Sequence, residues 1–274
     1  MNNDRVNSAG QHAVNKDVRE ITVDVDNGLR VITLNRPKKK NALSTEMYDG
    51  LSQALREAAE DENTVITVLT GNGDYYSSGN DLKNAEKFLD FDLNEAASKS
   101  SIRVRDFVSD FIEFPKILVA AVNGPAIGIG VTTLALCDVV YASEKATFYT
   151  PFSALGISAE GCSTYTFPRI MGVSKASEML YFNAKMTAHE AERCGLVSKV
   201  FPDATFKKEV FSHLQSLLNL PAKSLIYTKH LIRQWDIEAL RKANEAECER
   251  LKERWSSGDP MNAMVNFLSR RSKL

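Results

Sequence analysis

The chain has 274 residues, of which 43% are hydrophobic, and its formal net charge at pH 7 is -1. This composition supports a sizeable core, and the length fits one large α/β domain with an appendage. The near-neutral charge excludes a global electrostatic case for nucleic acid or for an acidic membrane surface. No apolar run approaches the roughly 20 residues that span a bilayer. The four cysteines lie far apart without a CxxC pair, which indicates reduced thiols inside the cell and no zinc site.

The two ends of the sequence differ in character from the rest. Residues 1–17 are polar and lack the apolar stretch of a secretory signal, so we predict a disordered or linker-like lead-in. A single domain is expected over 18–274, with a core to about 200 and a helical region over about 203–270. The sequence closes on Ser272, Lys273 and Leu274, a tripeptide that the peroxisomal import receptor reads. We therefore expect the protein in the peroxisomal matrix.

A hairpin and a helix open the predicted domain. Apolar and polar residues alternate around an Asp-Asn-Gly turn, which predicts strands over about 20–25 and 29–35 joined at Asn27–Gly28. Ser44 is a candidate N-cap for a helix, because apolar residues recur after it at helical spacing. The β-branched run 64–71 predicts a buried strand.

Strands and helices alternate through the middle of the chain. We predict a helix near 100–113, followed over 116–143 by a strand, a glycine loop, an apolar helix and a second strand. A short strand at 145–151 comes next, and then helices near 163–171, 173–181 and 187–194. The chain continues with a strand at 198–201 and with helices to the end. This order excludes all-β folds and predicts an α/β core with a helical tail.

Two glycine loops each follow a predicted strand and enter a predicted helix. The first comprises Ser77, Ser78, Gly79, Asn80, Asp81 and Leu82, and the second runs from Asn123 to Gly130. Backbone N–H groups at a helix start favour an anion, and two such donors aimed at one point form an oxyanion hole. For either loop alone, a tight turn without function is the alternative. A dinucleotide motif is excluded, because Thr133 stands where its third glycine belongs.

Glu160 is the one charged residue between Lys145 and Arg169, in a chain that is 25% charged. One interpretation is a solvated loop residue. The other is a carboxylate kept without a permanent partner because it must take up a proton.

Five motifs in order resemble the crotonase (enoyl-CoA hydratase/isomerase) superfamily from about residue 20 onward. They are Asn35-Arg36-Pro37 with Asn41-Ala42, the SSGNDL loop, the NGPAIGIG loop, Cys137-Asp138, and the ATFYTPFSALG segment. The resemblance implies an α/β fold, a crotonase-like spiral of ββα units with a helical C-terminal region. It also implies assembly as a homotrimer or hexamer.

The resemblance also implies an activity. Hydratases of this family carry two acids at the positions of Thr132 and Phe152, so hydration lacks its catalytic groups here. The stretch SAEGCS resembles the peroxisomal type of Δ3,Δ2-enoyl-CoA isomerase, in which a glutamate at the place of Glu160 is the base. The implied reaction shifts the double bond of a 3-enoyl-CoA to 2-trans-enoyl-CoA in the oxidation of unsaturated fatty acids. Another crotonase reaction, such as 2-enoyl-CoA hydration, and a non-catalytic acyl-CoA-binding module are the alternatives.

The remaining site residues follow from the same resemblance. It assigns the oxyanion hole to the backbone N–H groups of Asn80 and Ile129. The residues expected to contact the acyl-CoA thioester are Ser77, Ser78, Gly79, Asn80, Asp81 and Gly128. Lys38, in the run Lys38-Lys39-Lys40, and Lys229 are candidates for the coenzyme phosphates, with a solvated surface role as the alternative for each, and Phe267 is a candidate for shaping the acyl pocket. No metal and no separate cofactor is expected, because coenzyme A is part of the substrate.

Overall fold

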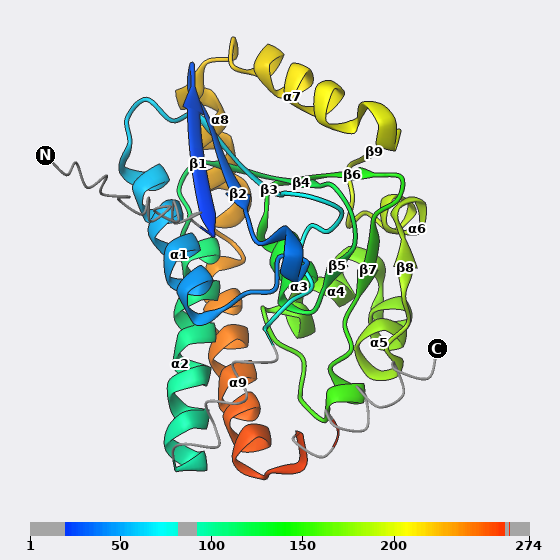
Figure 1. Ribbon diagram of the computed structural model, residues 1–274. Coiled ribbons are helices and arrows are strands. Elements are labelled where there is room, and N and C mark those ends of the chain that lie inside the picture. Colours follow the sequence, from blue (N-terminus) through cyan, green and yellow to red (C-terminus); the bar gives the residue numbers. More distant parts are fainter. Residues whose placement is uncertain (1–19, 82–91, 261–262, 264–274) are drawn as a thin grey trace, which may run out of the picture.

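The structure is a computed structural model, and it describes residues 20–81, 92–260 and 263 (Figure 1). The predicted lead-in over 1–17, the acyl-pocket candidate Phe267 and the tripeptide 272–274 lie outside the described residues.

Two sheets form the framework of the molecule (Figure 1). The strands of the larger sheet, in spatial order, are β1 (Ile21–Asp26), β2 (Leu29–Leu34), β3 (Ile66–Gly71), β4 (Ile117–Val122), β6 (Val139–Ser143) and β9 (Lys199–Phe201). The smaller sheet contains β5 (Ala126–Ile127), β7 (Thr147–Tyr149) and β8 (Met186–Thr187). Strand β1 is antiparallel to β2, and every other neighbouring pair in the larger sheet is parallel. The strand–strand–helix order, as in β1-β2-α1 and β4-β5-α3, agrees with the predicted ββα units.

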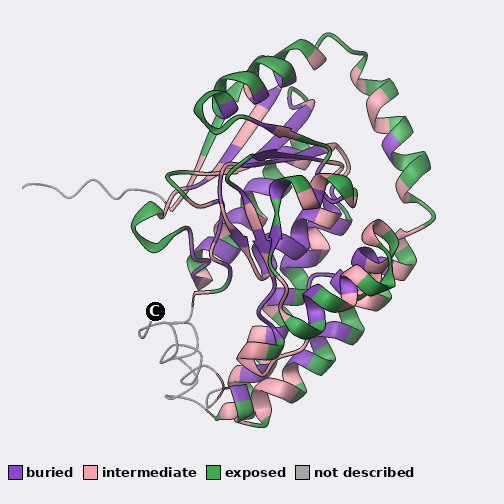
Figure 2. Cartoon of the chain, turned by 90° about the vertical axis from the view of Figure 1, so that its right-hand side faces the viewer, coloured by how far each residue is buried: buried purple, intermediate pink, exposed green. Residues whose placement is uncertain are grey.

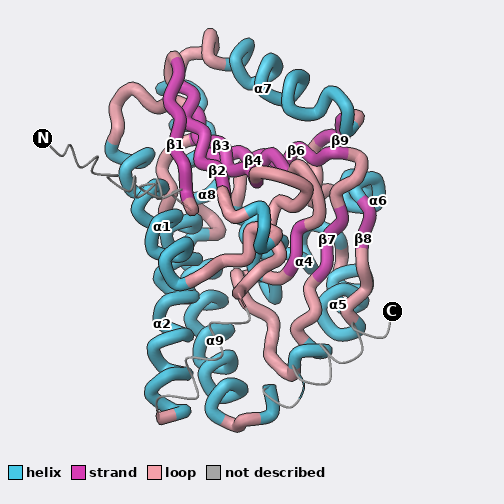
Figure 3. The backbone as a smooth tube through the Cα atoms, in the orientation of Figure 1, coloured by secondary structure: helices cyan, strands magenta, loops and turns pink. Residues whose placement is uncertain are grey.

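The helices lie around these sheets (Figure 3). They are α1 (Thr45–Glu60), α2 (Leu93–Ile112), α3 (Ile129–Thr132), α4 (Ser163–Met171), α5 (Val173–Phe182), α6 (Ala188–Arg193), α7 (Phe206–Leu217), α8 (Ala222–Arg233) and α9 (Ile237–Ser256). The long helices α2 and α9 lie side by side, and the side-chain amide of Asn244 on α9 donates to the Arg105 carbonyl of α2 at 2.8 Å. The C-terminal region therefore packs onto the first half of the domain.

The hairpin and the first helix confirm the sequence predictions. Asn27 and Gly28 have φ values of 48° and 92°, and a two-residue turn of the type that matches strand twist needs φ > 0 at both positions. At the start of α1, the Ser44 hydroxyl oxygen accepts a hydrogen bond from the Met47 amide at 3.2 Å.

Many residues of the larger sheet are buried (Figure 2), and their side chains belong to two cores, one on each face of the sheet. In β4, Leu118, Ala120 and Val122 face the larger core, which also contains residues of α1, α2 and α9. The alternating residues Val119 and Ala121 face the second core, which α7 covers. Because successive side chains of a strand point to opposite faces, burial on both faces explains the uninterrupted apolar run in the sequence.

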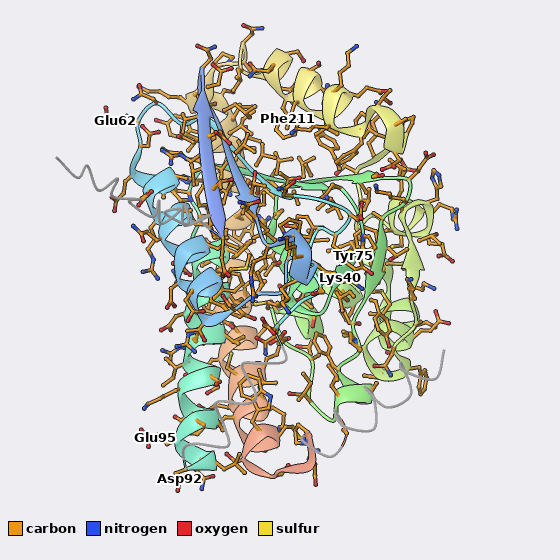
Figure 4. The ribbon with its side chains drawn as sticks, viewed as in Figure 1. Lys40, Glu62, Tyr75, Asp92, Glu95 and Phe211 are labelled. Atoms are coloured by element: carbon orange, nitrogen blue, oxygen red, sulfur yellow. The ribbon has the colours of Figure 1, made fainter. Side chains whose placement is uncertain are left out.

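Four elements differ from the sequence predictions. Helix α2 begins at Leu93, earlier than the predicted 100, and the Asp92 carboxylate caps it by accepting from the Asn94 and Glu95 amides at 2.8 and 3.2 Å (Figure 4). The predicted apolar helix after the second glycine loop is only the four residues of α3 and a 3-10 turn. There the Thr133 hydroxyl donates to the Ile129 carbonyl at 2.7 Å and competes with the helical backbone bonds. Strands β5 and β8 were not predicted, because each has only two residues, too few to form a sequence pattern.

Candidate active site

The two glycine loops leave the larger sheet at the same edge. Strands β3 and β4 are parallel neighbours, so their carboxyl ends lie together, and one loop follows each strand. The Ile127 amide donates to the Ser77 carbonyl at 2.9 Å, and Ser77 and Ala126 form a parallel bridge. In open α/β sheets, ligands bind beyond the carboxyl ends of the strands. The paired loops therefore mark the candidate site.

Glycines permit the close approach of these loops. Gly79 has φ +81°, and a Cβ atom there would lie 2.7 Å from the Ile127 carbonyl oxygen. A Cβ atom on Gly130 would lie 3.0 Å from the Ser77 Cβ. The amide of Ile129, at the start of α3, has no acceptor in the part of the chain that the structure describes. The loop geometry thus brings the segments that carry the Asn80 and Ile129 amides together.

Asn41 makes hydrogen bonds to the first glycine loop and to the residues that lead into it. It is fully buried, and it adopts a left-handed conformation with φ 52°. Its side-chain nitrogen donates to the carbonyl oxygens of Asn72 and Tyr75 at 2.9 and 2.7 Å, and its side-chain oxygen accepts from the Arg36 amide at 2.9 Å. The Ser77 hydroxyl donates to the Asn41 carbonyl at 2.9 Å. The Asn-Arg-Pro motif and Asn41 therefore position the loop.

The side chains of Ser77 and Asp81 act within the first loop. Ser77 is fully buried, and its hydroxyl oxygen accepts from the Gly79 amide at 3.1 Å. The Arg36 guanidinium donates to the Asp81 carboxylate at 2.8 Å and to the Ala42 carbonyl at 2.7 Å. Both predicted binding residues thus use their side chains to shape the loop, which leaves backbone groups to meet a ligand.

Glu160 is buried at the start of the turn into α4. It is 6% exposed, which contradicts the alternative of a solvated loop residue. Burial, followed by the nearby charge of Glu247, raises the pKa of Glu160 to about 8. No group of the described residues donates a hydrogen bond to its carboxylate.

Glycine again explains how Glu160 reaches the loops. A Cβ atom on Gly161 would lie 2.2 Å from the Thr132 hydroxyl oxygen and 3.3 Å from the Ile129 Cδ1 atom. The residue after Glu160 is therefore packed directly on α3, which begins with the second glycine loop. This contact places the Glu160 carboxyl beside the two glycine loops.

The positions of the two hydratase acids are buried. Thr132 is fully buried, and Phe152 is 2% exposed within the larger core. A threonine hydroxyl and a phenylalanine ring cannot act as a general acid or base near neutral pH, so neither side chain replaces a missing carboxylate.

The lysine run lies next to the first loop. Lys38, Lys39 and Lys40 are exposed around the 3-10 turn Pro37–Lys39. The Lys40 carbonyl accepts from the Ser78 amide at 2.9 Å. The Lys40 ammonium lies 5.0 Å from the centre of the Tyr75 ring (Figure 4). The location of this run therefore fits the predicted contact with coenzyme phosphates, which stays a prediction.

The structure corrects the prediction for Lys229. Its side chain is 7% exposed, and its ammonium donates to the Asp138 carboxylate at 2.8 Å and to the Lys116 carbonyl at 2.6 Å. The same carboxylate accepts from the Leu118 amide and pairs with Arg233. Lys229 thus anchors α8 to the residues just before β4 and β6 instead of facing a ligand. The sequence could not reveal this, because the partners lie about a hundred residues away.

Replacing Lys229 with Met should lower the free energy of unfolding by about 3 kcal/mol, because it leaves part of a buried ion pair uncompensated. Affinity for coenzyme A should not change. Lys242→Met is the control, since Lys242 on α9 is 75% exposed and should cost at most about 0.5 kcal/mol. Denaturant titration measures stability, and calorimetry with coenzyme A measures affinity. Weaker coenzyme binding at unchanged stability would restore Lys229 as a phosphate ligand.

Two residues near Glu160 were not found from the sequence. The Tyr48 phenol, on α1, and the Glu247 carboxylate, on α9, both interact electrostatically with Glu160. Tyr48 resembles any apolar-face residue of α1, and Glu247 lies in a helix rich in charge. Only packing distinguishes them from their neighbours.

Other kinds of site are absent from the described part of the chain. It contains no group of three or more side chains that could hold a metal ion. None of its helices is both long and apolar enough to cross a bilayer. The four cysteines are unpaired.

Comparisons with known proteins give matches over most of the chain. Residues 24–273 match the family described as enoyl-CoA hydratase/isomerase. The chain is 53% identical over 254 residues to enoyl-CoA delta isomerase 2 of Homo sapiens, covering 93% of this chain and 64% of the relative. It is 47% identical over 269 residues to "Enoyl-CoA delta isomerase 3, peroxisomal" of Mus musculus, covering 97% and 84%. This chain thus spans slightly less than two thirds of the human relative's length.

A solved structure gives the same result for the fold. The crystal structure of an enoyl-CoA hydratase/isomerase from Pseudoalteromonas atlantica T6c has a TM-score of 0.83 and 30% identity, covering 92% of this chain and 98% of that one. The predicted crotonase-like fold with C-terminal helices is therefore confirmed. With a family match over most of its length and a fold shared with a solved member, the chain belongs to the enoyl-CoA hydratase/isomerase family.

Proposed function

We propose that the chain moves the double bond of a 3-enoyl-CoA to give 2-trans-enoyl-CoA, in the oxidation of unsaturated fatty acids. The observation that carries the proposal is the buried carboxyl of Glu160 beside the glycine loops. Its pKa is raised to about 8. A carboxyl with a pKa near the working pH can both remove and return a proton. The names of the human and mouse relatives support the same reaction.

The glycine loops would stabilise the charge that develops on the thioester. We assign the donors to the backbone amides of Asn80 and Ile129, which follow Gly79 and Gly128 where the loops pack together. Preorganised donors of this kind contribute roughly 3–4 kcal/mol each to the transition state. The carbonyl oxygen carries most of the negative charge once C2 has lost its proton.

Glu160 would transfer one proton between two carbon atoms. The carboxylate takes the proton from C2, and the electrons of that C–H bond enter a dienolate that extends from the carbonyl oxygen to C4. The protonated Glu160 then returns the proton to C4, which leaves the double bond between C2 and C3. No second reactant enters, so one carboxyl suffices as base and acid.

The coenzyme would lie along the first loop, against the backbone of residues 77–81 and Gly128. Lys38 in the exposed run beside Ser78 supplies positive charge for the phosphates. Coenzyme A arrives as part of the substrate, and no further cofactor enters the reaction.

Assays on purified chain test the proposal. The chain is incubated separately with a 3-enoyl-CoA and a 2-enoyl-CoA, and the acyl products are identified by mass and by chromatography. We expect conversion of the first to the 2-trans isomer and negligible addition of water to the second. Rapid hydration would identify a hydratase, and binding without turnover would identify a non-catalytic acyl-CoA-binding module.

Where Leu274 carries the free carboxylate, Ser272, Lys273 and Leu274 should direct the protein into the peroxisomal matrix through the import receptor. The name of the mouse relative supports this location. Deleting the three residues should leave a fluorescent fusion in the cytosol, with the untruncated fusion as control. Peroxisomal import of the truncated fusion would contradict the proposal.

We also propose a homotrimer or hexamer. Large apolar side chains are exposed along α8 and just beyond it, namely Tyr227, Leu231, Ile232 and Trp235. Exposed apolar patches mark interaction sites, and the i, i+4 spacing of Tyr227 and Leu231 puts both on one face of α8. Light scattering should give a mass of three or six chains, and Leu231→Asp with Trp235→Asp should reduce it. The control Val25→Asp changes an exposed apolar residue of β1 and should leave the mass unchanged. A monomeric wild type would contradict the proposal.

A further inference from the structure

We propose that Glu247 on α9 is a positioning residue for Glu160, because its carboxylate fastens the turn after Glu160 and keeps a negative charge beside it. The inference rests on the proposed function, in which Glu160 is the base. It adds a second buried carboxyl, 87 positions later in the sequence, to the site.

Three hydrogen bonds connect Glu247 to this turn. Its Oε2 atom accepts from the Cys162 amide at 2.7 Å, and its Oε1 atom accepts from the Thr164 amide at 2.9 Å and the Thr164 hydroxyl at 2.6 Å. Cys162, the N-cap of α4, has φ 60° and makes no side-chain cap of its own. Glu247 therefore satisfies helix-start amides that α4 leaves without a local partner.

The same turn holds Glu160. The Ser163 hydroxyl donates to the Glu160 carbonyl at 2.7 Å, and Gly161 abuts Thr132 on α3. Residues on the C-terminal side of Glu160 are thus fixed to α3 on one side and to α9 through Glu247 on the other. Loss of the Glu247 bonds would free the backbone that aims the Glu160 carboxyl.

The two carboxyls have opposite surroundings. Glu247 has three donors, which stabilise its charged form, whereas no described group donates to the Glu160 side chain. Burial raises the pKa of Glu247, and its hydrogen bonds from Thr164 and Cys162 oppose that rise. Of two buried carboxyls, the one that accepts more hydrogen bonds ionises more readily, so Glu247 ionises before Glu160.

The other titratable groups around Glu160 do not reverse this. The Tyr48 phenol on α1 and the Cys248 thiol on α9 interact with it, and both have raised pKa values, first because of burial and then because of the Glu160 charge. Arg103 on α2 acts on Tyr48. The pKa of the Cys162 thiol is also raised, first by burial and then by the charge of Glu247. Among the described residues, Glu247 is the charge that raises the pKa of Glu160.

A direct titration tests the inference. The Glu160 carboxyl is followed by carbon NMR in protein labelled at glutamate side chains, and its signal is assigned by its loss in Glu160→Gln. In Glu247→Gln, the midpoint should fall by on the order of one pH unit or more from the wild-type value of about 8, because a like charge has been removed. The control Glu249→Gln makes the same change on the exposed side of α9 and should leave the midpoint unchanged.

Turnover provides the second measurement. The pH dependence of kcat/KM for 3-enoyl-CoA reports the free enzyme's base, so its rising limb should move to lower pH in Glu247→Gln by the same amount. A purely structural cap would lower turnover equally at every pH and leave the Glu160 midpoint in place, which would overturn the inference. If the wild type does not isomerise 3-enoyl-CoA, the proposed function fails, while the NMR titration still decides the role of Glu247.

Glu247→Asp covers the case in which Glu247→Gln does not fold. It keeps the charge but is too short to reach both Cys162 and Thr164. The midpoint of Glu160 should stay above pH 7 while turnover falls, because the turn is no longer held. A Glu160 midpoint near the ordinary glutamate value of 4.5 in this variant would contradict the inference.

Discussion

Glu160→Gln should lower the turnover of 3-enoyl-CoA by a factor on the order of 10² or more, the usual effect of removing a general base. The amide preserves the shape of the side chain but neither accepts the C2 proton nor returns it at C4. Since the oxyanion and coenzyme contacts proposed above lie in the glycine loops, affinity for acyl-CoA should change little.

Turnover and binding must be measured on the same preparations. Steady-state kinetics give kcat, calorimetry with a non-reactive acyl-CoA gives affinity, and Glu249→Gln on the exposed side of α9 serves as the matched control. Near-wild-type turnover in Glu160→Gln would eliminate the one-base mechanism. Joint loss of turnover and binding would instead indicate that Glu160 supports the structure of the site.

Gly79→Ala should lower kcat by on the order of 10² or more, the effect of losing one oxyanion donor. The added Cβ would lie 2.7 Å from the Ile127 carbonyl oxygen, which belongs to the second loop. The two loops must separate to accept it, so the Asn80 and Ile129 amides can no longer point at one oxygen atom.

Gly172→Ala is a control for backbone strain. Gly172 has φ +78°, close to the +81° of Gly79, but a Cβ atom added at Gly172 would meet no other atom within 4 Å. Gly172→Ala should lose about 1–3 kcal/mol of stability, because alanine disfavours this positive-φ conformation, and Gly79→Ala should lose at least as much. Only Gly79→Ala should lose turnover. Equal kcat in the two variants would show that the loops do not hold the thioester oxygen.

Local signals in the sequence sufficed for the first part of the fold. The Asn27–Gly28 turn and the Ser44 cap involve residues within four positions of one another, and both formed as predicted. The glycine loops were also visible, since tight turns after buried strands require particular residues. The same local signals overestimated the length of α3, where the Thr133 hydroxyl competes for the Ile129 carbonyl.

The sequence by itself determined that a single acid stands in a neutral stretch, and its motifs identified the family. Tertiary structure alone decided what surrounds that acid. Segments far apart in the chain bury Glu160. The hydrogen bonds from Cys162 and Thr164 to Glu247, and the ion pair of Lys229 with Asp138, also join distant segments. A pKa depends on desolvation and on charges across space, and neither is encoded in the identity of sequence neighbours. For that reason a lysine expected to bind phosphate anchors a helix, while an inconspicuous glutamate of α9 lies beside the proposed base.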